Sequence, residues 1–181
     1  MTLNKPPSEP LRAIPRLETE RIVMRDWQGS DLDAFAAMGA DREVMRFVGG
    51  VVDREQAWRM MSVFAGHWPL RGFGTWVVER RADGAVLGRA GLWQPEGWPG
   101  LEVGWLFARP AWGHGYASEA ARAAVAWAWA NVEAEELISL IAPDNARSIA
   151  VAERLGMAPL RAHDHYGVEV TVYGLDRPNP G

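Results

Sequence analysis

The chain has 181 residues, a formal net charge of −4 and no cysteine. This length suits one domain with a single hydrophobic core, and 48% hydrophobic and 23% charged residues are typical of a globular protein. The acidic balance argues against a nucleic-acid or anionic-membrane partner, and the absence of cysteine excludes disulfides, thiolate metal sites and a cysteine nucleophile.

The two ends of the chain differ from its middle. Residues 1–15 contain four prolines and little apolar periodicity, so we expect a flexible arm there rather than a secretory signal. No apolar run reaches the ~20 residues needed to cross a bilayer. We therefore predict a cytoplasmic protein without a membrane partner, with one domain over residues 16–177 and a short tail over 178–181.

The first half of the chain predicts one strand followed by three helical segments, over residues 17–27, 31–39, 41–47 and 54–67. Asp53 is a good cap for the longest of these helices, and Pro69 and Gly72 are expected to end it.

A hairpin is predicted next, from strands over residues 75–80 and 85–93, because Asp83-Gly84 between them is a strong turn signal. A loop with two prolines and two glycines, residues 94–100, follows it. Tryptophans of the later strand and helix are expected in the core, namely Trp105, Trp127 and Trp129. For those near turns, Trp68, Trp93 and Trp98, both a place in the core and a place along a substrate groove are compatible with the sequence.

The most informative stretch, Leu101 to Ala120, predicts a strand, a glycine-rich turn and an alanine-rich helix that starts at Tyr116. Gly113 and Gly115 permit a tight backbone with free N–H groups at the positive end of the helix dipole, an arrangement that binds phosphate. Walker A is excluded because no Lys-Ser or Lys-Thr follows the glycines, and the third glycine of a dinucleotide fingerprint is missing. Taken alone, the pattern fits a ligand-free turn equally well.

The remaining segments are a strand over residues 136–142, a helix over 146–155, and two last strands over 157–162 and 168–175 around a polar loop. Asn145 is a suitable N-cap for the helix, and Gly156 is a suitable stop. The order of elements predicts an α/β (α+β) fold, a mixed, mostly antiparallel sheet of about seven strands with helices on both faces.

Two motifs together resemble the GNAT superfamily of acyl-CoA-dependent N-acetyltransferases, in particular its ribosomal-protein-alanine N-acetyltransferase branch. The first is Trp112-Gly113-His114-Gly115-Tyr116-Ala117, which matches the family's pyrophosphate loop except that Trp112 stands where Gln or Arg is usual. The second is Asn145-x-x-Ser148 followed by Leu155-Gly156-Met157. The resemblance extends from about Leu17 to Leu175 and implies a GNAT fold that uses acetyl-CoA as cosubstrate, without a metal.

The resemblance assigns cosubstrate binding to residues of the strand, the loop and the later helix: Leu106, Phe107, Ala108, Gly113, His114, Gly115, Tyr116, Ala117, Ser118, Asn145 and Ser148. It places the phosphates on the loop amides, with Arg109, Arg147 and His114 as nearby positive charges. It also implies a strand bulge near Phe107 whose N–H binds the oxyanion.

Glu102 is the predicted general base. It shares a strand face with Gly104 and Leu106, where the glycine leaves room for a groove, and its position matches the base of the family. The alternative interpretation is a solvated glutamate on a half-exposed strand.

Ser148 is the predicted hydrogen-bond donor to the departing thiolate. The tyrosine that many family members place seven residues after the asparagine is Ala152 here. Tyr166 in the last loop is the reserve candidate, and a serine that only stabilises the helix start is the alternative. Asn145 is expected to contact cosubstrate or substrate, to cap the helix, or to do both.

These features predict an N-acetyltransferase that transfers an acetyl group directly, in a ternary complex, to the primary amine of a protein N-terminus or a small molecule. The acidic balance favours a cationic acceptor, near which the resemblance places Arg46, Phe47 and residues 66–74. A homodimer is compatible with the family. A non-catalytic acyl-CoA sensor is the alternative function, and the His163-Asp164-His165 cluster predicts a polar loop near the acceptor rather than a metal site.

Overall fold

The computed structural model describes residues 13–178. Most of the predicted N-terminal arm and nearly all of the predicted tail lie outside this range. Within the described residues, no helix combines the length and the apolar character needed to cross a bilayer.

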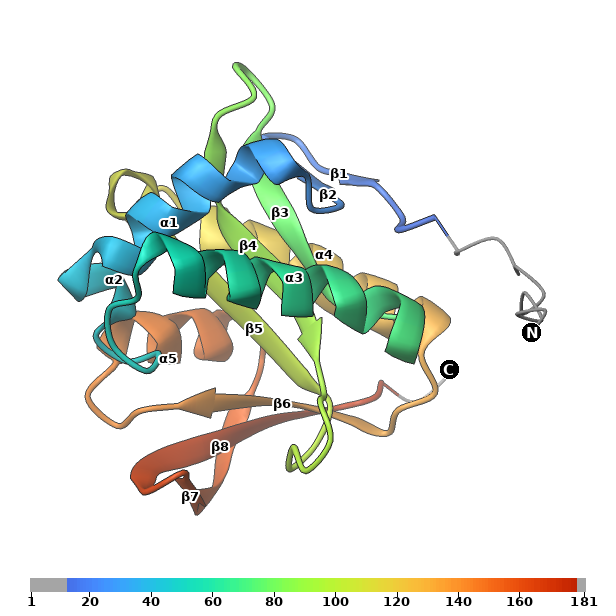
Figure 1. Ribbon diagram of the computed structural model, residues 1–181. Helices are drawn as coiled ribbons and strands as arrows, with labels where there is room; N and C mark the ends of the chain where they lie inside the picture. The colour runs from blue at the N-terminus through green and yellow to red at the C-terminus, as the bar shows by residue number, and fades with distance from the viewer. Residues whose placement is uncertain (1–12, 179–181) are drawn as a thin grey trace, which may run out of the picture.

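The described chain alternates short strands with helices (Figure 1). The strands are β1 (Leu17–Glu18), β2 (Ile22–Arg25), β3 (Thr75–Arg80), β4 (Val86–Trp93), β5 (Glu102–Phe107), β6 (Glu136–Ile141), β7 (Ala158–His165) and β8 (Val168–Asp176). The helices are α1 (Leu32–Ala40), α2 (Arg42–Met45), α3 (Arg54–Arg71), α4 (Tyr116–Asn131) and α5 (Ala146–Arg154), with short 3-10 turns η1 (Gly29–Asp31) and η2 (Arg109–Ala111).

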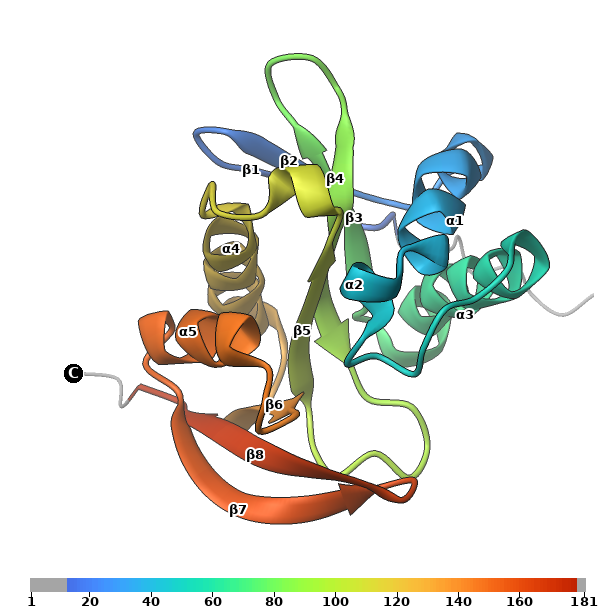
Figure 2. The same ribbon diagram turned by 90° about the vertical axis from the view of Figure 1, so that its left-hand side faces the viewer.

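All eight strands form one sheet in the order β1-β2-β3-β4-β5-β6-β8-β7. Every neighbouring pair is antiparallel except β5 and β6, which run parallel. Helices α4 and α5 cover one face and α1 to α3 cover the other, as Figure 2 shows. The predicted fold class is therefore confirmed.

The predicted first strand is wrong in one respect, because it is two strands joined by a tight turn. β1 pairs antiparallel with β2, with Leu17 opposite Met24. The turn between them contains no glycine or proline, so the pattern looked continuous. It is held from outside by Glu119 of α4, which accepts hydrogen bonds from the Thr19 hydroxyl and the Arg21 N–H.

Two further boundaries differ from the prediction. α3 continues through Pro69 and ends at Gly72, which adopts the left-handed conformation (φ 78°) and donates its N–H to the Trp68 carbonyl. Trp68 is buried and holds this last turn in place by donating its indole N–H to the Thr75 carbonyl. The predicted loop after residue 162 is shorter than expected, because residues 163–165 extend β7 and pair with β8.

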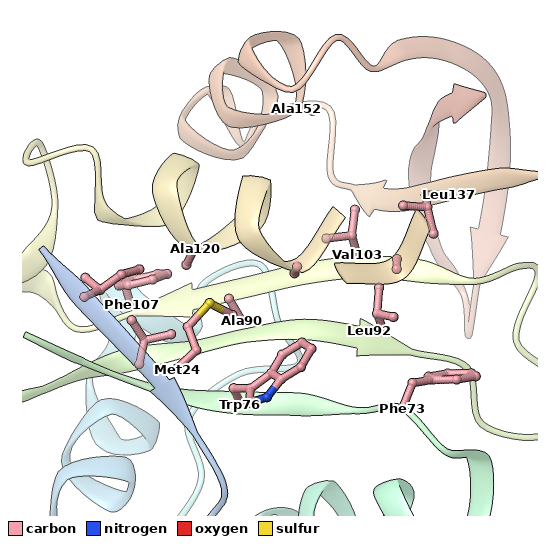
Figure 3. Close-up of a cluster of buried hydrophobic side chains, with 14 of the residues drawn as sticks. Met24, Phe73, Trp76, Ala90, Leu92, Val103, Phe107, Ala120, Leu137 and Ala152 are labelled. Atoms are coloured by element: carbon pink, nitrogen blue, oxygen red, sulfur yellow. The ribbon is translucent and has the colours of Figure 1, made fainter. Parts of the chain in front are cut away.

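The core is divided by the sheet into two clusters. The larger one packs β-strand side chains, including Trp76, Val103 and Phe107, against alanines of α4 such as Ala120 (Figure 3). The smaller cluster joins Leu106 to α1, α2 and α3. Alternate residues of β5 thus face opposite layers, which places Glu102, Gly104 and Leu106 on the side of α1 to α3.

Strands β5 and β6 separate almost as soon as they meet. Glu102 and Ile138 are their one pair of register partners, and the Ile138 N–H donates to the Leu101 carbonyl. Figure 1 shows β6 leaving the line of β5 at a wide angle. Most of β5 therefore has no neighbouring strand on the β6 side, and this open edge lies between α4, α5 and α2.

A buried charge network fixes the start of α1 to the sheet. The Arg25 guanidinium of β2 donates to both carboxylate oxygens of Asp31, at 2.7 and 2.8 Å, and to Glu79 of β3 at 2.6 Å. Arg25 is 8% exposed and Asp31 is 2% exposed. The hydrogen bonds with Asp31 raise the pKa of Arg25 against the effect of burial, so the guanidinium stays charged.

We expect Asp31→Ala to lower the free energy of unfolding by about 3 kcal/mol, because it leaves a buried guanidinium without its main partner. Asp33→Ala is the matched control. Asp33 pairs with Arg54 at the surface, where both side chains are exposed, so its loss should cost less than about 1 kcal/mol. Urea denaturation of both variants measures the difference, and equal losses would contradict a structural role for the network.

Candidate active site

A cavity of about 1100 Å³ lies along the open edge of β5. Its wall contains the glycine turn, the first turns of α4 and α5, and Val44 and Phe47 at the opposite side. Leu106 and Phe107 of β5 also line it. The cavity therefore reaches from the α4 side of the sheet, past the strand edge, to the side on which Glu102 lies.

The glycine turn presents a row of unused N–H groups to this cavity. Gly113 and Gly115 both have positive φ, 79° and 80°, and Gly115 is the N-cap of α4. The first amide of this helix to bond backwards is that of Glu119, to the Gly115 carbonyl. Within residues 13–178, none of the amides from Gly113 to Ser118 donates to a protein acceptor. The turn can therefore offer these N–H groups to an anion.

Arg21 and Glu119 hold the turn in this shape. The Arg21 guanidinium donates to the His114 carbonyl at 2.9 Å and to the Glu119 carboxylate at 2.7 Å. Burial alone would raise the pKa of Glu119, but hydrogen bonds from Thr19 and Arg21 lower it below its ordinary value. Sequence patterns gave no signal for this pair, whose members lie 98 residues apart.

Trp112 stands where the family pattern has Gln or Arg, but a positive charge is still present beside the turn. Its indole N–H donates to the Phe107 carbonyl at 2.8 Å, and the Arg147 guanidinium lies 3.8 Å from its ring centroid. Arg147 lines the cavity, as do His114, Arg122 and Arg154. Arg109 does not line it and is instead paired with Asp41 at 2.9 Å.

Asn145 and Ser148 lie together at the start of α5. The Asn145 side-chain oxygen accepts the Ser148 N–H at 3.2 Å, which is the predicted cap, and both residues line the cavity. No hydrogen bond between the Ser148 hydroxyl and the rest of residues 13–178 is formed. Tyr166 lies elsewhere, 84% exposed at the β7–β8 turn, so the structure does not bring the reserve candidate to the cavity.

The other predicted cosubstrate residues also lie at the cavity, apart from Ala108. The Ala108 N–H donates to the Leu87 carbonyl of the neighbouring strand, so it is already used. The bulge expected near Phe107 is also absent from the β4–β5 pairing, which runs in continuous register from Glu102 to Phe107. The separation of β5 from β6 frees the strand edge instead.

Glu102 lies where the two strands part, on the far side of Leu106 and Gly104 from the cavity. Its carboxylate accepts the Trp98 indole N–H at 2.7 Å and the Leu140 N–H at 3.4 Å. Burial raises the pKa of Glu102 to about 7, against the lowering effects of Trp98, Leu140 and the nearby Arg89. A carboxylate with this pKa can accept a proton near neutral pH.

The space above Gly104 is open. A methyl group placed on this glycine would meet only the Glu102 carboxylate, at 3.8 Å. Aromatic side chains stand around Glu102, with Trp98 against Trp93 and Trp93 against Phe64. The carboxylate therefore borders a small, largely apolar space next to the strand edge.

The outer part of this aromatic group comes from the C-terminal hairpin. The His165 ring packs edge-on against Trp98, with 4.6 Å between ring centroids. His165 of the polar cluster at 163–165 thus lies against the tryptophan that donates to Glu102. Within the described residues, no group of three His, Asp or Glu side chains is arranged to hold a metal.

Comparison with known proteins agrees with this geometry. The sequence model of the acetyltransferase (GNAT) domain matches residues 21–158. The uncharacterized protein YkkB of Bacillus subtilis is 31% identical, over 90% of this chain and 96% of its own. The crystal structure of an acetyltransferase from Agrobacterium tumefaciens superposes with a TM-score of 0.81 at 31% identity, covering 90% of this chain and 95% of that one.

A ribosomal-protein acetyltransferase shares the fold at a lower sequence identity. The structure of RimL, a ribosomal L7/L12 alpha-N-protein acetyltransferase in complex with coenzyme A, superposes with a TM-score of 0.73 at 14% identity. The overlap covers 87% of this chain and 95% of RimL.

Proposed function

The chain belongs to the GNAT acetyltransferase family, and on this basis we propose that it transfers an acetyl group from acetyl-CoA to a primary amine by direct attack in a ternary complex. One observation carries the proposal. A row of free main-chain N–H groups and a half-buried carboxylate with a pKa of about 7 lie on the same strand–turn–helix unit.

The turn fits the diphosphate of coenzyme A in three respects. Its amides are unoccupied, both glycines keep bulky side chains away from them, and Arg147 adds a positive charge beside Trp112. The cavity of about 1100 Å³ has the size class of a site for a large ligand. We assign the phosphates to residues 113–118 and the arm that follows them to the open edge of β5.

Glu102 is the proposed base. Acetyl-CoA supplies the acetyl group as a thioester. Glu102 takes the proton of the attacking ammonium, either directly or through a water, so that the neutral amine can form the new C–N bond as the C–S bond breaks. The space above Gly104 is where the amine would lie, within reach of both the strand edge and the carboxylate.

Ser148 is the proposed donor to the departing thiolate. Ser148 lines the cavity and its hydroxyl is not used within the described residues, whereas the Asn145 side-chain oxygen is already used as the cap. A main-chain N–H on the open edge of β5 is the proposed donor to the oxyanion. The chain contains no cysteine, so no acetyl-cysteine intermediate can form, in keeping with direct transfer.

The test of the proposal is thiol release from acetyl-CoA with a panel of primary amines, as a function of pH. With an amine of pKa about 10.4, such as a lysine side chain, kcat/KM should show a limb near pH 7, because Glu102 must be deprotonated to act. Glu102→Gln should lower kcat/KM by about 10²- to 10³-fold and remove this limb.

Glu136→Gln is a suitable control, since Glu136 begins β6 on the neighbouring strand and does not line the cavity. A Glu102→Gln enzyme with an unchanged rate and pH profile would show that another group is the base. Binding of coenzyme A without turnover of any amine would favour the sensor function instead.

We expect Gly115→Ala to weaken coenzyme A binding by at least about tenfold, as measured by calorimetry. Alanine is strained at a φ of 80°, and its methyl group would lie 3.5 Å from the Arg21 guanidinium that holds the turn. Gly97→Ala is the matched control, with the same φ and open space in the loop before β5, and should bind coenzyme A like the parent protein. Equal effects from the two substitutions would argue against the glycine turn as the phosphate site.

A further inference from the structure

Arg89 of β4 is a half-buried cation with a buried Nε, and the proposed reaction does not use it. It lies opposite Leu106 in the β4–β5 register, and Glu102 lies opposite Trp93. Arg89, Leu106, Gly104 and Glu102 therefore share one face of the sheet. The Cα positions of Arg89 and Glu102 are four residues apart along the strands, which corresponds to about 13 Å.

Between these two charged residues the sheet carries no side chain. Gly91 of β4 is the register partner of Gly104 of β5. As described above, the position above Gly104 is open except for the Glu102 carboxylate. The corresponding position on Gly91 is filled by the Gly74 carbonyl and Trp76, so the open space belongs to Gly104. A short molecule above Gly104 would thus have an acidic group toward one end and a basic group toward the other.

The Arg89 guanidinium lacks a polar partner. Its buried Nε has no hydrogen-bond acceptor, and among residues 13–178 Arg89 forms no ion pair; Glu102 acts on it only through its charge. The guanidinium lies over the Phe64 ring, 4.5 Å from the centroid. Burial lowers the pKa of Arg89 to about 10, with Glu102 acting in the opposite direction, so the group is still charged at neutral pH.

Glu102 does not neutralise this charge by direct contact. Both of its oxygens accept hydrogen bonds from other groups, the Trp98 indole and the Leu140 amide. A buried guanidinium N–H without an acceptor costs stability, so a protein keeps one where a ligand supplies the missing acceptor or where it has another function.

We propose that the acceptor is an amino acid: an amine that carries a carboxylate one or two carbons away, with the carboxylate on Arg89 and the amine toward Glu102. This inference rests on the proposed acetyl transfer and names its substrate class. It also replaces the cationic acceptor that the net charge of the chain suggested. Net charge describes the whole surface, whereas Arg89 would repel a second ammonium group within the site.

The test compares α-amino acids with their primary amides as acceptors, in pairs that differ only in the carboxylate. Values of kcat/KM are calculated on the ammonium form, which is the species from which Glu102 takes a proton in the proposed reaction. The acids should be preferred by about 10- to 100-fold, the range expected for a charge-assisted hydrogen bond. A linear diamine should be a poorer acceptor than either member of a pair.

Arg89→Met should reduce the acid-to-amide ratio to near one, and Arg89→Lys should keep part of it. The methionine fills similar space without a buried charge, so the variant should fold, which its melting temperature and its affinity for coenzyme A will check. Arg59→Met, the same change at an exposed arginine of α3 that pairs with Glu55, should keep the full ratio.

The outcomes separate this inference from the proposed function. Equal rates with acids and amides, or a preference for the diamine, would overturn the amino-acid assignment and leave acetyl transfer intact. If no amine is turned over, binding of N-acetyl amino acids and of their amides, followed by tryptophan fluorescence, decides the matter. Carboxylate-selective binding that is lost in Arg89→Met supports the assignment, and binding without selectivity overturns it.

Discussion

The early separation of β5 from β6 is the constraint on which the site depends. Parallel neighbours in a sheet normally pair along their length, but here one register pair is followed by divergence, and the Leu140 amide donates to the Glu102 side chain at the point of separation. The same geometry therefore creates a free strand edge, opens a cavity between the two helical layers, and holds a carboxylate beyond Leu106 and Gly104, outside the lining of that cavity. No single residue of β5 would produce these features if β6 continued alongside it.

The electrostatic environment of the glycine turn, at the outer end of the site, differs from that of Glu102 and Arg89, at the inner end. At the outer end, unused amides and arginines around the glycine turn favour a strongly negative, solvent-exposed group. At the inner end, burial makes charge costly, so Glu102 has a raised pKa and Arg89 a lowered one. A cosubstrate with phosphates at one end and a neutral thioester at the other suits this gradient, and a small zwitterion suits the pair of charged side chains beyond it.

The sequence was sufficient where local patterns decide the structure. Strand β5, the Gly113–Gly115 turn and the start of α4 were predicted because alternation, glycine and alanine content act within a few residues. The split of the first strand was missed because Glu119, nearly one hundred residues away, holds the turn. Likewise, Pro69 favours a helix end in the sequence, but α3 continues past it because the Trp68 indole anchors the last turn to the Thr75 carbonyl. Trp98 and Arg89 could not be assigned, since their roles depend on neighbours brought close only by the sheet.

The most direct test is a crystal structure of the protein with bound acetyl-CoA. The diphosphate oxygens should lie within hydrogen-bond distance of the amides between Gly113 and Ser118, and the acetyl group should lie at the open edge of β5 beside Gly104, facing Glu102. A diphosphate bound at another surface, or an acetyl group separated from Glu102 by the intact strand, would contradict the site described above.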